Sequence, residues 1–201
     1  MKFNIAPVIG MLLLSIIFSV PIMANELAPC GTELSKEQRE WLRAYQANPV
    51  QYKAAGEDPD YLPLKVHIVG TDEGTGYFAT ADVFRLVCEV NDQYTGSGMQ
   101  FFISGDFNYI NNDDYYDHNY FTGAEMMNQY NEPNVINMYI VDNPNDNCGY
   151  YSPGLDALAV AKSCSDQGST TLAHELGHYF SLPHTFSGWE GAYEGDGTLI
   201  Y

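Results

Sequence analysis

Residues 174–184 read HELGHYFSLPH and hold three of the five histidines in the chain. His174 and His178 are four positions apart, so on a helix they lie on one face, one turn above the other. At that spacing two imidazole nitrogens can bind one zinc ion, each at about 2.0–2.1 Å. The stretch therefore predicts a helix that carries two ligands of a zinc ion.

The third histidine of this stretch can join the other two only if the helix stops first. In a continued helix, His184 would lie about 9 Å beyond His178 and about 240° around the axis. Pro183 lacks a backbone donor and disfavours helical angles at Leu182, so it provides the break. We therefore expect the chain to turn back and present His184 as a third ligand. Three protein nitrogens and one position left for water are typical of a catalytic zinc site.

Glu175 follows the first histidine directly. On a helix its side chain points about 100° away from that of His174, beside the metal position and not onto it. A carboxylate there can accept a proton from zinc-bound water and deliver it to a leaving group. We therefore predict that Glu175 is a general base.

Residues 168–170 (GST) offer caps for this helix, which we expect over residues 171–180.

Upstream of this helix, the sequence alternates strand patterns with helix patterns. Strands are expected at 64–69, 99–104, 135–141 and 157–161. Helices are expected at 33–46 and 80–94, the first with a stripe of apolar residues that includes Trp41 and Tyr45. Residues 106–120 are expected to form a polar connection. This alternation predicts an α/β domain with at least four strands.

The first 24 residues predict a secretory signal peptide. Lys2 is the only charge before Glu26, residues 8–23 are mostly apolar, and Ala24 offers a small residue for cleavage. The alternative is an uncleaved membrane anchor over residues 5–24, a run that is disfavoured by three helix breakers: Pro7, Gly10 and Pro21. We therefore expect a secreted protein that has no membrane association after signal cleavage.

The composition excludes two classes of partner. The chain has 8 Lys+Arg against 26 Asp+Glu, a formal net charge of −18. Nucleic acids and anionic membranes are bound through clustered basic residues, so neither is expected as a partner. With 45% hydrophobic residues, the chain also has the apolar side chains that strongly disordered chains lack.

Secretion would place the four cysteines in an oxidising compartment, where disulfides form. They are Cys30, Cys88, Cys148 and Cys164. Four cysteines allow three complete pairings, and the sequence alone does not choose among them. We favour a disulfide between Cys148 and Cys164, because these two residues flank one loop-and-strand unit.

The zinc motif resembles that of the metzincin metallopeptidases, whose long form is H-E-x-x-H-x-x-G-x-x-H. Within them, the chain is most similar to the pappalysin/cytophagalysin-type secreted peptidases, through residues 64–69 (LKVHIV), 90–92 (VND) and 184–186 (HTF). The resemblance covers residues 62–190 or so. It implies an α+β zincin fold, whose upper subdomain has a mixed, mostly parallel sheet of four to five strands, a backing helix and an active-site helix.

The resemblance also assigns roles by position in the family motif. His174, His178 and His184 would be the zinc ligands, and Glu175 the general base. The chain would divide into a signal peptide at 1–24, a propeptide or N-terminal segment at 25–62 and a metallopeptidase domain at 63–201.

A cysteine of the N-terminal segment matches a latency device of the family. Some members hold a Cys-Gly-Thr stretch in the propeptide whose cysteine coordinates zinc and keeps the enzyme latent. Residues 30–32 (CGT) match it and make Cys30 a candidate latency switch. The alternative for Cys30 is an ordinary disulfide. If Cys30 is the switch, Cys88 is expected to be a buried free thiol.

The chain departs from the family pattern at two points. The family glycine is Ser181 here, in a turn that often has positive φ, where a residue other than glycine costs about 1–2 kcal/mol. We expect the turn to tolerate it. The family also has a methionine-containing turn after the third ligand, whereas the last methionine here is Met138. The lower subdomain is therefore expected to be largely missing, as in a truncated reading frame or a remnant that binds zinc with little cleavage.

Other polar residues are interpreted without catalytic roles. His67 lies in a β-rich run and is expected to be a hydrogen-bonded sheet histidine, whereas His118 is expected to be solvated. The oxygen-rich residues 106–117 are a candidate Ca²⁺ site, but they do not follow the spacing of calcium loops. A second calcium candidate comprises Glu190, Glu194 and Asp196.

These features together predict a secreted zinc-dependent endopeptidase, made as a latent precursor, that hydrolyses protein or peptide substrates. The alternative is a secreted zinc-binding domain with weak or no catalysis that acts as a binding module. A zinc aminopeptidase of another fold would usually have a glutamate much further along the chain as its third ligand, so His184 argues against it.

Overall fold

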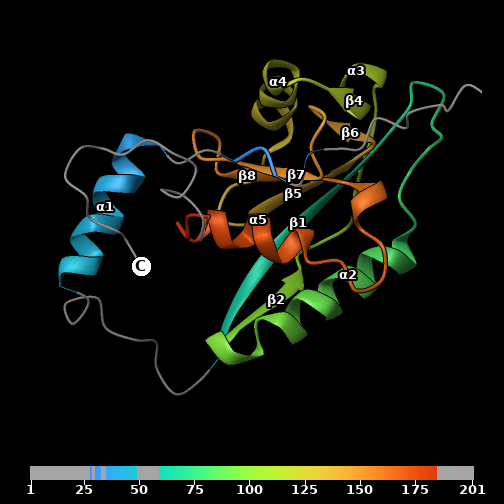
Figure 1. Cartoon of the computed structure of the whole chain (residues 1–201). Coiled ribbons are helices and arrows are strands. Elements are labelled where there is room, and N and C mark those ends of the chain that lie inside the picture. Colours follow the sequence, from blue (N-terminus) through green and yellow to red (C-terminus); the bar gives the residue numbers. More distant parts are fainter. Residues whose placement is uncertain (1–27, 29, 33–34, 49–58, 185–201) are drawn as a thin grey trace, which may run out of the picture.

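The computed structural model describes residues 28, 30–32, 35–48 and 59–184 (Figure 1). The expected signal peptide and the calcium candidate at residues 190–196 lie outside these residues. Within the described ranges, no helix combines the length and the apolar character needed to cross a membrane.

A six-stranded mixed sheet forms the centre of the fold (Figure 1). Its order is β2 (Met99–Ile103), β1 (Asp60–Gly70), β5 (Ile136–Val141), β8 (Ala157–Ala161) and β7 (Gly149–Ser152), and β3 (Asn108–Asn111) also pairs with β1. All pairs are parallel except the antiparallel pair β7–β8. The mixed, mostly parallel sheet is thus confirmed, with one strand more than the four to five expected.

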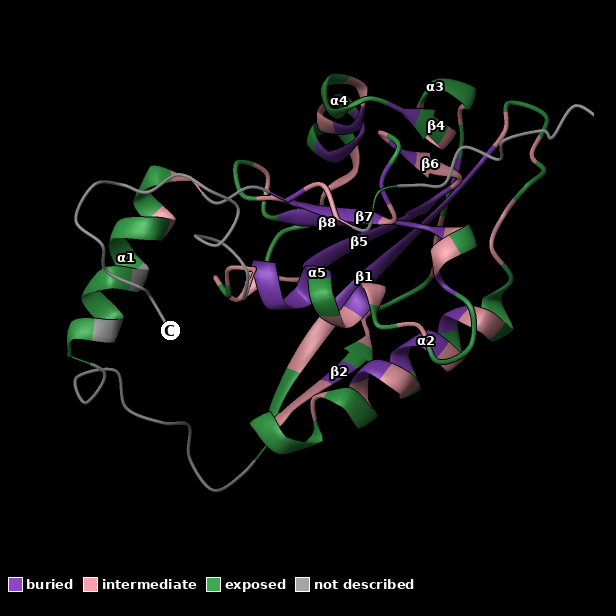
Figure 2. Cartoon of the chain, viewed as in Figure 1, coloured by how far each residue is buried: buried purple, intermediate pink, exposed green. Residues whose placement is uncertain are grey.

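Helices cover both faces of this sheet (Figure 2). On one face, α2 (Thr80–Gln93) and α5 (Thr171–Tyr179) pack against alternate residues of β1, with Leu64 and Val66 in one cluster with Leu176. On the other face, α4 (Tyr120–Tyr130) packs Met126 and Met127 against β5. The expected backing helix is α2, and α5 is the helix of the histidine motif. Both are confirmed.

The N-terminal helix α1 (Lys36–Ala47) begins at a capping box. The Ser35 hydroxyl accepts a hydrogen bond from the Gln38 N–H, and the Gln38 side chain accepts one from the Ser35 N–H. Trp41 and Tyr45 stack on each other and remain exposed. The helix expected at 33–46 is therefore confirmed, but these two residues of its apolar stripe are not buried.

The expected polar connection at 106–120 is more structured than its sequence indicates. It contains β3, the short helix α3 (Asp113–Tyr116) and β4 (Asp117–His118), which pairs with β6 (Asn143–Pro144). Side chains replace missing backbone partners here: Asn112 caps α3, and Asn119 caps α4.

The two histidines outside the motif are both buried. His67 lies in β1, where its Nε2–H donates to Asn137 Oδ1 at 3.1 Å and its Nδ1 accepts from Asn108 at 2.9 Å, which confirms the interpretation. The expectation that His118 is solvated is wrong, because it is 4% exposed. Its Nδ1–H donates to the Tyr115 carbonyl, and its Nε2 accepts from the Tyr150 hydroxyl. These partners allow a neutral ring to be buried under α4.

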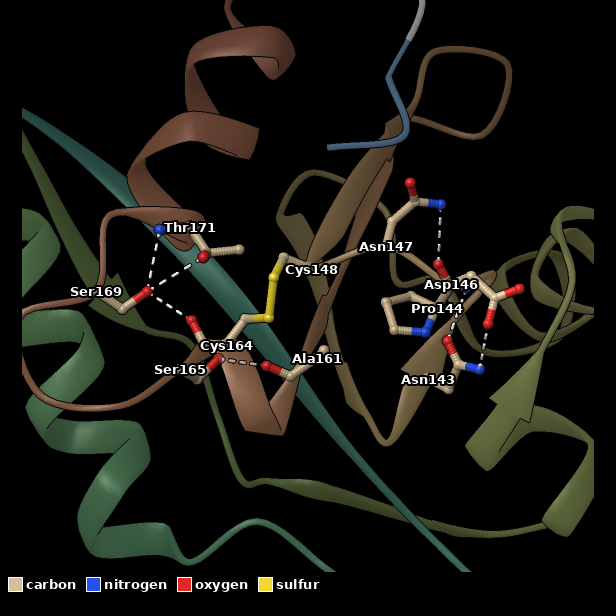
Figure 3. The surroundings of a disulfide bond; sticks show 10 residues. All are labelled: Asn143, Pro144, Asp146, Asn147, Cys148, Ala161, Cys164, Ser165, Ser169 and Thr171. Atoms are coloured by element: carbon tan, nitrogen blue, oxygen red, sulfur yellow. Dashed lines mark hydrogen bonds between the residues drawn. A yellow bond between two sulfur atoms is a disulfide. The ribbon is translucent and has the colours of Figure 1, made fainter. Parts of the chain in front are cut away.

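Cys148 and Cys164 form the expected disulfide (Figure 3). It ties the residue before β7 to the end of η3 (Lys162–Cys164), which follows β8. Cys30 and Cys88 are free thiols. Cys88 is exposed on α2, so the expectation of a buried thiol is wrong: its helical position faces away from the sheet.

The chain reverses at Ser181, which has a φ of 65°. The Ser181 N–H donates to the carbonyl of His178, and the Leu182 N–H donates to that of Gly177 at 2.9 Å. These bonds satisfy two carbonyls at the end of α5. The expected left-handed turn is present and accommodates serine.

We predict that Ser181→Gly leaves the protein as stable as the parent or more stable. Glycine removes a penalty of about 1–2 kcal/mol at positive φ but adds about 0.5–1 kcal/mol of chain entropy to the unfolded state. A thermal melt should therefore show a Tm that is unchanged or higher by about 2–4 °C. Ser181→Ala, which keeps the Cβ atom, should match the parent. A fall of several degrees for Ser181→Gly would contradict this account.

Candidate metal centre

The helix α5 places the histidine motif under the edge of the sheet. Its apolar side, with Leu172 and Leu176, is buried against the strands. The hydroxyl of Tyr94, the residue that follows α2, donates to the Ala173 carbonyl of α5 at 2.9 Å. From this packed helix, His174 and His178 line a pocket that is also lined by Leu182, Pro183 and His184.

Three imidazole nitrogens converge at one point. The Nε2 atom of His178 lies 3.0 Å from that of His174 and 3.1 Å from that of His184, and the last two are 3.1 Å apart. Nitrogens bound to one tetrahedral zinc ion would be about 3.3 Å apart. The three rings thus fit a metal ion with a shift of only a few tenths of an ångström.

The turn after α5 also orients one of these rings. The His178 Nδ1–H donates to the Leu182 carbonyl at 2.8 Å, so the lone pair is on Nε2. Burial, opposed by this hydrogen bond, lowers the pKa of His178 to about 4, and the neighbouring imidazoles act in the same direction. The ring is therefore neutral and faces the metal position, as metal-binding histidines require.

Cys30 supplies a fourth atom to this group. Its Sγ lies 3.5 Å from His178 Nε2, and the four potential ligand atoms all lie within 4.8 Å of one another. In a tetrahedral zinc site with one sulfur, the sulfur and a nitrogen would be about 3.5 Å apart. Burial and the nearby Glu175 raise the pKa of the thiol to about 11. A bound divalent cation reverses this preference, because a coordinating thiol loses its proton.

Glu175 lies beside the group and does not contribute to it. Its side chain is fully buried, and its Oε2 accepts a hydrogen bond from the Thr32 hydroxyl at 3.0 Å. Its Oε1 has no hydrogen-bond partner among the described residues. Burial raises the pKa of this carboxyl to about 7. Gly149 makes room for it, since a Cβ there would lie 2.9 Å from Glu175 Cγ.

A short N-terminal stretch lies along the free edge of β7; we call residues 28 and 30–32 the docked segment. Ala28 forms a parallel bridge with Asn147, and the Gly31 N–H donates to the Gly149 carbonyl at 2.9 Å. The expected position of Cys30 next to the histidines thus follows from strand-edge pairing. Sequence reasoning missed the contact of Thr32 with Glu175, because no local pattern connects residues 143 positions apart.

No calcium site emerges from the described residues. Among them, only the Cys30–histidine group gathers three or more potential metal ligands of the Cys, His, Asp or Glu type. In this loop the Asn112 side chain instead caps α3, and the Asp113 carboxylate accepts a hydrogen bond from the Asp72 N–H at 2.9 Å. The calcium expectation is therefore unsupported for this loop.

Fold and site together define a class: an α/β domain with a mixed sheet and a histidine–cysteine group able to bind a metal ion. A helix near the antiparallel edge strand supplies two of the three histidines of this group. The chain has the same fold as promirolysin from Tannerella forsythia, whose solved structure is that of a mutant. The TM-score is 0.57 and the sequence identity 14%, over 79% of this chain and 70% of that one.

Two further proteins are similar to this chain. An extracellular metalloprotease of Pyricularia oryzae is 28% identical over 166 residues, which are 73% of this chain and 57% of that protein. The chain thus spans less than two thirds of that relative. Metalloproteinase-II from Bacteroides fragilis has a TM-score of 0.42 and 14% identity, over 75% of this chain and 60% of that one. No family model matches the chain.

We predict that the chain binds one zinc ion and that the histidine group holds it. His178→Ala should lower the zinc affinity by roughly a hundredfold or more, because a ligand is lost. Glu175→Gln is the matched control and should keep the affinity within about threefold, because this side chain bonds to Thr32 and not to the metal position. Equilibrium dialysis against a competing chelator measures both values. Equal losses in the two variants would contradict this assignment.

Proposed function

We propose that this chain is a secreted zinc-dependent endopeptidase of the metzincin class, of pappalysin/cytophagalysin type. The observation that supports it most is the convergence of three Nε2 atoms within 3.1 Å, with the buried carboxylate of Glu175 beside them. The fold shared with promirolysin and the similarity to an extracellular metalloprotease point the same way. The proposal includes a signal peptide at 1–24, a propeptide at 25–62 and a peptidase domain at 63–201.

His174, His178 and His184 would hold the metal, and each residue around them has a defined task. Zinc, when bound there, would polarise the scissile carbonyl and make water acidic. Glu175 would accept the proton of that water on its carboxylate and pass it to the leaving amine. Burial suits this task, since it brings the pKa of the carboxyl to about 7, near the range where proton transfer in both directions is efficient.

The free edge of β7 would bind the substrate. β7 pairs with β8 on one side only, and its other edge offers the Gly149 carbonyl and the Tyr151 N–H, which the docked segment uses here. An extended peptide can add to such an edge as a further strand. We propose that a protein or peptide substrate lies antiparallel to β7. The bridge between Ala28 and Asn147 is parallel, so the docked segment runs in the direction opposite to that proposed for a substrate. This direction would keep its own peptide bonds from being presented for cleavage.

Cys30 would keep the precursor latent. Its Sγ lies 3.5 Å from His178 Nε2, and with a metal ion bound it would take the fourth ligand position, which the reacting water would otherwise occupy. A site closed by four protein ligands does not admit water or a carbonyl.

The same four-ligand arrangement supports the second candidate, a zinc-stabilised binding module. Structural zinc sites are closed by four protein ligands, and here Cys30 and the histidines supply them. In that case the docked segment would stay in place permanently, and zinc would add to stability without catalysis.

We predict that the zinc-loaded chain cleaves casein once the docked segment has been removed by limited proteolysis. Glu175→Gln should lower the kcat of this activated form by about 10²–10⁴-fold, because the general base is lost. A strong chelator should abolish cleavage, and added zinc should restore it. The zinc content of Glu175→Gln, measured in the same samples, controls for loss of metal. A zinc-loaded parent without cleavage, before and after removal of the docked segment by limited proteolysis, would instead favour the binding module.

We also predict that Cys30→Ala removes a lag in the appearance of activity. Loss of the thiol opens one ligand position, so the variant should cleave from the first time point, whereas the parent should need activation. Cys88→Ser is the matched control, since Cys88 is exposed and does not belong to the histidine–cysteine group. An unchanged lag in Cys30→Ala would count against the latency role.

A further inference from the structure

We propose that Thr32 is a second latch, one that holds the docked segment on the site without the thiol and without the metal. Its regulatory meaning rests on the proposed function, but the contacts that carry it do not. Thr32 is 6% exposed and lies between β7 and α5.

The Thr32 hydroxyl makes two hydrogen bonds at once. It donates to Glu175 Oε2 at 3.0 Å and accepts from the Tyr151 N–H at 2.7 Å. The first partner belongs to α5 and the second to β7, so one hydroxyl connects the segment to both walls of the site. Valine has the same shape as threonine but can make neither bond.

The burial of Glu175 makes the first bond important. When the segment is docked, this carboxyl group is fully buried, and its Oε1 has no hydrogen-bond partner among the described residues. Oε2 takes the Thr32 hydroxyl in place of water. Without that hydroxyl, docking would bury the carboxyl without the Thr32 donor and would remove the acceptor that the Tyr151 N–H has here, and both losses disfavour the docked state.

Gly31 allows the hydroxyl to reach this position. Its N–H donates to the Gly149 carbonyl, and its own carbonyl accepts from the Tyr120 hydroxyl at 2.9 Å. A Cβ on Gly31 would collide with the Tyr120 hydroxyl and lie 2.7 Å from Asn147 Nδ2.

The wall that closes over Gly31 is itself held in place. The Asn147 side chain donates to the carbonyls of Asn145 at 2.6 Å and Pro144 at 3.3 Å, the second bond being drawn in Figure 3. The next residue is tied by the disulfide to Cys164. A side chain at position 31 therefore cannot be accommodated by a simple shift of this loop.

The two latches would block different groups. The thiol of Cys30 would take a metal ligand position. The hydroxyl of Thr32 occupies Glu175, the proposed base, and the Tyr151 N–H, a donor that the edge strand would offer to a peptide. Thr32 thus acts on the proton-transfer group and on the peptide-binding edge together, and its action needs no metal.

The test measures how fast the Cys30 thiol reacts with iodoacetamide in the metal-free full chain. Cys88→Ser serves as the parent, so that Cys30 is the single free thiol while the disulfide stays intact. Thr32→Val should increase the rate at least about tenfold, because the docked state loses about 1.4 kcal/mol or more. Thr32→Ser, which keeps the hydroxyl, should remain within about threefold of the parent. Gly31→Ala should react as fast as Thr32→Val.

The outcome separates this latch from the proposed peptidase activity. Equal rates for Thr32→Val, Thr32→Ser and the parent would overturn the latch, whatever the chain cleaves. If Thr32→Val does not fold, as judged by its thermal melt, a rate of Gly31→Ala equal to that of the parent overturns it in the same way. An increase confined to Thr32→Val and Gly31→Ala supports it even if no substrate is ever cleaved, because neither zinc nor substrate is present.

Discussion

The site depends on α5 ending within one turn of His178. A helix one turn longer would carry His184 away from the other two histidines, and the group would have two nitrogens instead of three. The reversal at Ser181 brings the third ring back and places the Leu182 carbonyl against His178 Nδ1. One left-handed residue therefore creates the third potential ligand and orients the second.

The second constraint is a carboxyl group buried beside these rings. An isolated buried carboxylate is strongly disfavoured, so its surroundings must compensate for the lost water. Gly149 provides the space, and Thr32 provides a hydrogen bond from a part of the chain that is distant in sequence. The edge strand β7 joins these features, because it presents Gly149 to Glu175 on one side and backbone groups to the docked segment on its free edge.

The sequence predicts those parts of the structure that local patterns specify. A few consecutive residues contain each of these patterns: the spacing of the histidines, the proline at 183 and the buried runs of β1, β5 and β8. Each of them was predicted. β7 reads GYYS and α4 contains a glycine and no charged cap, so their patterns are too weak for either element to be recognised. The burial of His118 depends on Tyr150, 32 residues away, and the docked segment depends on pairing across more than a hundred residues. Such contacts are properties of the assembled sheet and leave no local signal.

Charge connects the two proposed states of the site. The three imidazoles would be neutral ligands, whereas the thiol of Cys30 and the carboxyl of Glu175 would each become an anion with a metal ion bound nearby. A divalent cation bound there would balance those two charges when the segment is docked, so the closed site would be neutral inside a low-dielectric environment. Removal of Cys30 would leave the loaded metal site with one positive charge in excess. That charge would favour any ligand that donates an electron pair at the position that Cys30 had taken. In the proposed peptidase, the docked segment would therefore compete with water and peptide carbonyls by charge at the metal and by hydrogen bonding at Thr32. A chain that used charge alone would lose its hold on the site whenever the metal was absent, and the hydroxyl of Thr32 supplies the contact that does not depend on it.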